Sequence, residues 1–381
     1  MKPYIFSILF CILTSISIAQ TKEVILKKSY KVDKNTILNL DLDNVAIIFE
    51  ESFDDKIHFD YSMIFGRYSN RKREMIKNQT KVKTTHKNGL LTLNVKNSEF
   101  LGINLLYYPE FTPNFKTDSV FISMKDFIKK EKERKGVYKT KDSILNEIGF
   151  SEGSYLTDFL KRTNNSKSRS SIKNKKVIIK KFVVKLPKYM KLRVKSINSN
   201  LTFNYDITQP LLLNSFKGTF KFKNILGKEN RIIASNGIFQ AEEINNGRIE
   251  FLDMNKVVIG EMSNISFATE TSRIQIGEIG KNVGLNDFNS KLYLYNFSKN
   301  FIKFNLKGDY SELNLYNITK SNFSMDVFGH NTTLNMNETK TSFGLSKDKK
   351  LDKILEKKVK ENKVSQGNIA IELKNGILNI K

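Results

Sequence analysis

The chain runs through Ile274-Gln275-Ile276, Val283-Gly284-Leu285, Leu292-Tyr293-Leu294, Ile302-Lys303-Phe304 and Leu313-Asn314-Leu315, which are apolar-x-apolar triplets that begin nine to eleven residues apart. Successive side chains of a strand point to opposite faces, so each triplet places two apolar side chains on one face. A strand this short cannot fold alone, because ordering the backbone costs about 1–2 kcal/mol per residue. The triplets therefore predict short, half-buried strands that stack on one another.

The same unit extends over the region from Leu201 to Met336. The further inward pairs are Leu201/Phe203, Leu211/Leu213, Phe220/Phe222, Phe239/Ala241, Ile249/Phe251, Val257/Ile259, Ile265/Phe267, Phe323/Met325 and Leu334/Met336, with Ile232 in the longer gap after Phe222. This repeat predicts an all-β fold, a β-solenoid resembling a single-stranded β-helix, with a partly helical insertion. The spacing fits two strands per coil at about twenty residues or three per coil at about twenty-eight, and the sequence does not choose between them.

The turn residues also favour a solenoid over a meander, a sandwich or a propeller. Those folds would show regular Asn-Gly, Asp-Gly or Pro-containing hairpin turns, whereas only Asn236-Gly237 and Asn246-Gly247 occur in the repeat region. Asn recurs where the coil must turn, because it tolerates a left-handed backbone and forms stacked ladders.

The amino terminus predicts export. Lys2 precedes an apolar run from Tyr4 to Ile18, and small residues precede a cleavage position after Ala19. Residues 1–19 are therefore interpreted as a signal peptide, and we expect a periplasmic, outer-membrane-surface or extracellular location. No later segment is long and apolar enough to span a membrane as a helix, so no transmembrane segment is expected in the mature chain. The only cysteine, Cys11, lies inside the signal.

The remaining chain divides by pattern into five parts. We expect amino-terminal β coils or a cap over 20–97, a basic, partly helical insertion over 98–174, and solenoid repeats over 175–342. A charged helix is predicted over 343–365 and a closing β-hairpin over 366–381. The segment Lys374-Asn375-Gly376-Ile377-Leu378 repeats the earlier Lys87-Asn88-Gly89-Leu90-Leu91.

The segment that enters the repeats carries a family resemblance. It contains Val183-Val184-Lys185-Leu186-Pro187-Lys188, then Leu192-Arg193-Val194, then Ser196-Ile197-Asn198-Ser199-Asn200-Leu201. This order resembles the "strand, Leu-Pro-Lys, strand, Ser-x-Asn-Gly" entry of the "putative adhesin" family of exported bacterial β-solenoid proteins. The resemblance implies a solenoid fold, export and a surface or periplasmic role, and it brings no catalytic residues.

Positive charge is the second strong signal. The formal net charge is +25, and no Asp or Glu occurs between Phe159 and Tyr205. Such a field attracts polyanions, which for an exported protein include lipopolysaccharide and anionic polysaccharide. The candidate anion-binding residues are Lys175, Lys176, Lys180, Lys181 and Lys185. The alternative is that the charge is only compositional. Nucleic acid is not expected as a partner, because Lys far outnumbers Arg and the chain is exported.

Three tyrosines form a second candidate surface. Tyr293 and Tyr295 flank the inward Leu294, and Tyr316 lies one two-strand coil beyond Tyr295, so two strands per coil would stack Tyr295 near Tyr316. If these rings face outward, they offer flat apolar surfaces with hydroxyls that suit sugar rings. The competing interpretation is an aromatic ladder that only stabilises the coils.

No catalytic, metal or cofactor signature emerges. The three histidines, His58, His86 and His330, are far apart in sequence, and no cysteine partner accompanies them. The sequence therefore predicts a non-enzymatic, adhesin-like envelope protein that binds anionic or glycan surfaces and needs no cofactor. Two alternatives stay open: a polysaccharide-acting envelope enzyme, which would gather carboxylates on one face, and a structural or regulatory protein that contacts a protein partner through the insertion.

Overall fold

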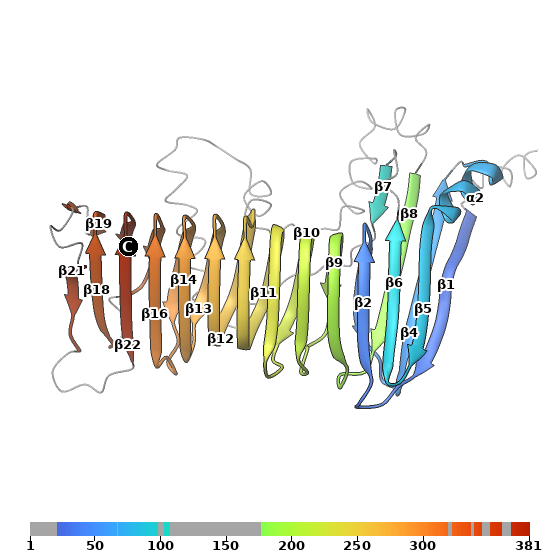
Figure 1. Ribbon diagram of the computed structural model, residues 1–381, viewed down its shortest axis with the longest axis horizontal. Helices are drawn as coiled ribbons and strands as arrows, with labels where there is room; N and C mark the ends of the chain where they lie inside the picture. Colours follow the sequence, from blue (N-terminus) through green and yellow to red (C-terminus); the bar gives the residue numbers. More distant parts are fainter. Residues whose placement is uncertain are drawn as a thin grey trace, which may run out of the picture.

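The computed structural model describes residues 21–66, 68–97, 103–106, 177–318, 322–336, 339–344, 351–359 and 367–381. In this part the chain is all-β apart from the short helix α2 (Figure 1). The elements are β1 (Thr21–Lys31), β2 (Ile37–Asp43), β3 (Ala46–Glu51), β4 (Lys56–Gly66), α2 (Asn70–Asn78), β5 (Thr80–Lys87), β6 (Leu90–Asn97), β7 (Ile103–Leu106), β8 (Val177–Leu186), β9 (Lys191–Phe203), β10 (Leu211–Ile225), β11 (Asn230–Leu252), β12 (Lys256–Glu270), β13 (Arg273–Ile279), β14 (Asn282–Phe288), β15 (Lys291–Phe297), β16 (Lys303–Asp309), β17 (Glu312–Leu315), β18 (Ser324–His330), β19 (Thr332–Met336), β20 (Thr339–Phe343), β21 (Asp352–Lys357), β22 (Asn368–Lys374) and β23 (Ile377–Ile380).

Most strand pairs are parallel, and they form a long sheet that runs in two rows (Figure 1). The first row contains β6, β2, the first part of β9 and of β10, both ends of β11, the end of β12, and then β14, β16, β22 and β18. The second row contains β8, β3, the later parts of β9 and β10, the middle of β11, the start of β12, and then β13, β15, β17, β23 and β19.

Each strand segment of the repeats pairs in register with the segment two apolar triplets later in the chain. Leu192 lies beside Leu211, Ile274 beside Leu292, and Leu294 beside Leu315. Long strands pass from one row to the other at residues with positive φ, such as Asn198 (48°) and Asn264 (54°). Asparagine dominates these bends, as the sequence predicts, because its side chain tolerates the left-handed region.

The inward residues of both rows form a single apolar core. Of the residues assigned inward from the triplets, all are buried except Ile302 and Met336. Ile302 is 52% exposed, so its inward assignment is wrong. Strand β16 begins one residue later, and it is Phe304 and Leu306 that enter the core.

Antiparallel strands end the parallel array on both sides. At the amino-terminal end β1 pairs with β4, β4 with β8, and β5 with β6. At the other end β21 pairs with β18 and β20 with β19. The charged helix expected over 343–365 is therefore wrong where the structure describes it, because residues 352–357 form strand β21. Leu355 of this strand lies opposite Val327, on a sheet edge that supplies backbone partners.

The closing β-hairpin expected over 366–381 is also wrong. Strands β22 and β23 are present, but they do not pair with each other. Strand β22 lies between β16 and β18, and β23 lies between β17 and β19, with every one of these pairings parallel. The last residues of the chain thus occupy a place inside the array rather than at its end.

Two further expectations lie largely or wholly outside the described residues. These are the signal peptide over 1–19 and the insertion over 98–174, of which the structure describes only strand β7. In the described ranges, no helix has the length and apolar character needed to cross a bilayer.

Candidate functional site

The predicted lysine cluster divides between two faces of strand β8. Lys175 and Lys176 lie outside the described residues, whereas Lys180, Lys181 and Lys185 belong to β8. Alternation places Lys180 on the opposite side of the strand from Lys181 and Lys185. Burial lowers the pKa of Lys180, and the Lys185 ammonium lies 3.4 Å from the Glu50 carboxylate. The structure therefore does not bring these three lysines together as one surface.

The predicted tyrosines stack as their spacing indicates but are not all presented to solvent. The rings of Tyr295 and Tyr316 are stacked with their centroids 5.0 Å apart. Tyr295 is only 1% exposed, so the expectation that its ring faces outward is wrong. Tyr293 is half-buried, and the Arg273 guanidinium lies 5.6 Å from the centre of its ring.

A larger set of cations lies on the first row, across the adjacent strands β5, β6, β2 and β9 and on β11. All are exposed, and we call them the basic face: Lys81, Lys83, Lys87, Lys96, Lys191, Arg193, Lys195 and Arg231. The strands are joined in register, with Lys83 opposite Asn94, Asn94 beside Asp41 and Asp41 beside Lys195. Since neighbouring strands lie about 4.8 Å apart, β5 and β9 are separated by roughly 14 Å.

The basic face keeps its positive charge largely uncompensated. Within β5, β6, β2 and β9 the acidic residues are Asp41 and Asp43 of β2, and the Asp41 carboxylate accepts a hydrogen bond from the Asn94 side-chain amide at 2.7 Å. None of its eight cations forms an ion pair with another described residue. By contrast, Lys188 just outside it pairs with Glu51 at 3.1 Å.

Sequence reasoning included Lys191, Arg193 and Lys195 in the acid-free stretch but missed the lysines of β5 and β6. Those lysines come from a much earlier part of the chain, and strand β2 joins the two groups by pairing with both β6 and β9. The available signal was alternation, because Lys81-Val82-Lys83 and Lys191-Leu192-Arg193-Val194-Lys195 each place every charge on one face.

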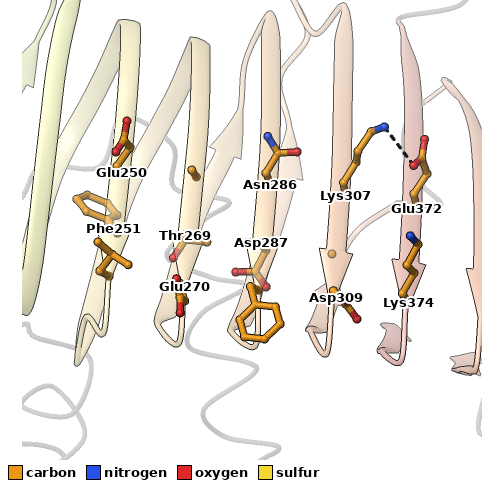
Figure 2. A pocket seen from close by; sticks show the side chains of 14 residues that line it. Glu250, Phe251, Thr269, Glu270, Asn286, Asp287, Lys307, Asp309, Glu372 and Lys374 are labelled. Atoms are coloured by element: carbon orange, nitrogen blue, oxygen red, sulfur yellow. Dashed lines mark ion pairs between the residues drawn. The ribbon is translucent and has the colours of Figure 1, made fainter.

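A shallow depression lies farther along the first row, over strands β11, β12, β14, β16 and β22 (Figure 2). It holds about 1080 Å³, part of it open to solvent. Two lines of outward side chains cross it from strand to strand. In strand order, one line is Glu250, Ala268, Asn286, Lys307 and Glu372, and the other is Leu252, Glu270, Phe288, Asp309 and Lys374. The hollow forms where Ala268 presents only a methyl group between Glu250 and Asn286.

Exposed apolar side chains stand among the charges of the depression. Phe288 is 46% exposed, and Tyr310 contacts it edge-on with the ring centroids 6.0 Å apart. Leu252 is also exposed. The Lys307 ammonium lies 3.3 Å from the Glu372 carboxylate, as the dashed line in Figure 2 marks, and the Asn375 amide donates to Asp309 at 3.0 Å.

A buried carboxyl group lies beneath this surface. Asp287 is 7% exposed, and burial raises its pKa, although hydrogen bonds from the Ser290 backbone N–H and the Ser311 hydroxyl to Oδ2 oppose the rise. Its Oδ1 atom has no hydrogen-bond partner among the described residues, and neither has Oγ1 of the neighbouring Thr269. Asp287 thus forms part of the floor and is not presented to solvent.

The structure offers no metal centre within the ranges it describes, since no three His, Cys, Asp or Glu side chains are grouped to hold an ion. His58 instead bonds to Asp54 at 2.9 Å, and His86 contacts the edge of Tyr30. The described surface thus has two distinct areas, one cationic and one of mixed charged and apolar side chains.

Comparisons with known proteins give little further guidance. No protein-family model and no curated protein matches the chain. A solved structure that does match is the crystal structure of a "putative cell adhesion protein" from Clostridium sporogenes ATCC 15579, with 9% sequence identity and a TM-score of 0.16. The match covers 95% of this chain and 99% of that chain. At this similarity it carries no argument about the site, and the family resemblance of the entry segment stays a prediction.

Proposed function

We propose that the two rows are the two sides of a β-solenoid with two strands per coil. The in-register pairs of successive coils support this, such as Ile259 beside Ile276 and Leu294 beside Leu315, as do the left-handed bends at which β9, β10, β11 and β12 pass from row to row. Side-chain ladders between coils support it too, such as Asn264 to Asn245 at 3.0 Å. An array of this kind presents regularly spaced outward residues along its length.

The function that this surface supports best is non-enzymatic, adhesin-like binding of an anionic envelope polysaccharide on the basic face. The observation that carries the proposal is eight exposed cations with no ion-pair partner among the described residues, gathered by strands from distant parts of the chain. Lysine ammoniums attract a polyanion over a long range, and the attraction weakens as salt screens it. An exported location, as the signal over 1–19 predicts, would bring the basic face to such polymers.

The test compares two variants of the same net charge. One replaces Lys83, Lys191 and Lys195 by Gln. The other replaces by Gln three exposed lysines that lie outside the basic face, Lys228, Lys299 and Lys303. Binding of the mature chain to heparin and to purified lipopolysaccharide is measured over a salt series. We expect the first variant to bind at least about tenfold more weakly and the second to match the parent.

Equal weakening in both variants would mean that net charge rather than the basic face drives binding. Salt-insensitive binding would also contradict the proposal, because contacts between exposed charges must respond to screening. A third variant, Lys175→Gln with Lys176→Gln, tests the residues that sequence reasoning favoured and the structure does not describe.

A second candidate function is a polysaccharide-acting enzyme. The observation in its favour is the gathering of Glu250, Glu270, Asp309 and Glu372 around one depression, because glycoside hydrolysis uses paired carboxyl groups. We rank it lower because Asp287, the carboxyl group of the lining whose pKa is raised, is buried beneath the surface. Release of reducing ends from a polysaccharide panel, lost in Glu270→Gln, would establish this function.

A further inference from the structure

We propose that the depression over β11 to β22 is a second binding site, for a neutral oligosaccharide that stacks a sugar ring on Phe288. The site is separate from the basic face and takes a different class of ligand. Phe288 is the exposed aromatic side chain of its lining, and the edge contact with Tyr310 holds the ring in place while leaving it 46% exposed.

The chemistry around Phe288 matches a sugar. The apolar face of a sugar ring packs on an aromatic ring, while its hydroxyl groups need both hydrogen-bond donors and acceptors at the rim. Acceptors are supplied by the carboxylates of Glu270 and Asp309, which flank Phe288 on the neighbouring strands in register. Donors are supplied by the Asn286 amide and the Lys374 ammonium, which line the same depression.

The charge of the depression selects against an anionic ligand. Its rim holds four carboxylates, from Glu250, Glu270, Asp309 and Glu372, against two ammonium groups, from Lys307 and Lys374. The Lys307 ammonium is already paired with Glu372, and Glu250 is paired with Arg248 at 2.8 Å, which leaves Glu270 and Asp309 against Lys374. An anionic polymer is therefore repelled where Phe288 is exposed, whereas a neutral polyhydroxylated ligand is not.

The size of the depression fits a ligand of more than one sugar ring. From β11 to β22 the lining crosses four strand spacings, or about 19 Å at about 4.8 Å each. The small residue Ala268 keeps the surface low on the β12 side of the β14 strand that carries Phe288.

The repeat provides a matched control for the test. Phe216 occupies the same outward position before a left-handed bend on β10, is 44% exposed, and lies outside the depression. The variants Phe288→Ala and Phe216→Ala therefore remove the same side chain from equivalent positions of the repeat, the Phe216 ring having the Lys217 ammonium 5.3 Å from its centre in place of the contact with Tyr310. Their binding to neutral hexasaccharides of glucose, mannose, xylose and N-acetylglucosamine is measured by calorimetry at low and high salt.

We expect at least one neutral hexasaccharide to bind the parent and Phe216→Ala equally, at either salt concentration, and Phe288→Ala to bind it at least tenfold more weakly. Glu270→Gln should weaken the same ligand without disturbing the fold, since Glu270 is exposed. Absence of binding by every neutral sugar would overturn the proposal, as would equal loss in both Phe variants. Selective binding of oligolysine would overturn it in favour of a cationic peptide. The basic-face variants leave these outcomes unchanged, so the two sites succeed or fail separately.

Discussion

The rings of Tyr295 and Tyr316 stack 5.0 Å apart with their planes 16° from parallel, although the two residues lie in different repeats of the sequence. The ammonium group of Lys381, at the end of the sequence, lies 5.4 Å from the centre of the Tyr316 ring and donates a hydrogen bond to its hydroxyl at 3.3 Å. Both rings are buried. These contacts thus join β15 to the residues that directly follow β17 and β23.

We expect the two tyrosines to contribute to stability as a coupled pair. Replacing either by Leu removes the stack, and a double-mutant cycle of Tyr295→Leu and Tyr316→Leu should give a coupling free energy of about 1 kcal/mol. Urea unfolding followed by circular dichroism measures it. Tyr30→Leu paired with Tyr316→Leu is the control, because Tyr30 lies on β1 at the other end of the array and should couple by less than about 0.5 kcal/mol.

Gly218 and Gly284 predict opposite responses to the same substitution. Gly218 has φ +132°, and an added Cβ would lie 1.9 Å from the Ser199 carbonyl oxygen. Gly284 has nothing within 4 Å of such an atom. Gly218→Ala should therefore lower the free energy of unfolding by about 2 kcal/mol or more, whereas Gly284→Ala should be neutral or stabilising. Thermal unfolding of both variants distinguishes them, and equal midpoints would contradict the bend geometry.

The inward assignment of the triplets predicts strong effects of buried charge. Leu294 is fully buried, and Leu294→Asp places an unpaired carboxylate in the core at a cost of several kcal/mol. We expect loss of β signal in the far-ultraviolet dichroism spectrum or a sharply lowered unfolding temperature. Ser266→Asp, at an exposed outward position of β12, should leave both unchanged.

The core could be predicted from the sequence because a period-2 pattern with regular spacing leaves each inward residue little freedom. Ile302, the exposed one of the two exceptions, comes after β15, where the offset between paired strands lengthens and Phe304 rather than Ile302 begins the inward pair. The helix predicted over 343–365 failed for a different reason. The apolar residues of this charged segment, Leu351, Ile354, Leu355 and Val359, have a helical spacing. The segment nevertheless forms a strand, because the open backbone edge of β18 supplies hydrogen-bond partners to β21.

The candidate sites could be predicted only in part, because strand pairing rather than sequence proximity assembles them. The contiguous run that includes Lys180 and Lys185 looks like one surface in the sequence, but alternation divides it between two faces. The basic face needs Lys83 and Lys195, which are far apart in the chain and meet only through β2 and β6. The depression needs residues from β11 and β22, and the position of β22 inside the array is not visible in any local pattern.

Two glutamates of the second row should change stability with pH in opposite directions. Glu278 lies in register with Glu261, and burial, with a smaller contribution from the Glu261 charge, raises its pKa above the usual 4.5. The folded state therefore holds the proton more tightly than the unfolded state. Its stabilising contribution is present below pH 4.5 and is lost as pH rises through the raised folded pKa. Glu278→Gln should raise the unfolding temperature at pH 7, and the gain should shrink toward pH 4.5.

Glu312 provides the opposite case in the same row of strands. Burial acts to raise its pKa, but hydrogen bonds from Lys291 and Asn314 outweigh burial and hold the pKa below 4.5. Its contribution to stability is therefore present above pH 4.5 and is lost as pH falls through the lowered folded pKa. Glu312→Gln should lower the unfolding temperature at pH 7, with a deficit that narrows in acid. Thermal melts of both variants and the parent from pH 3 to pH 8 check this. If the unfolding temperatures of the two variants followed the same dependence on pH, the opposite pKa shifts of Glu278 and Glu312 would be contradicted.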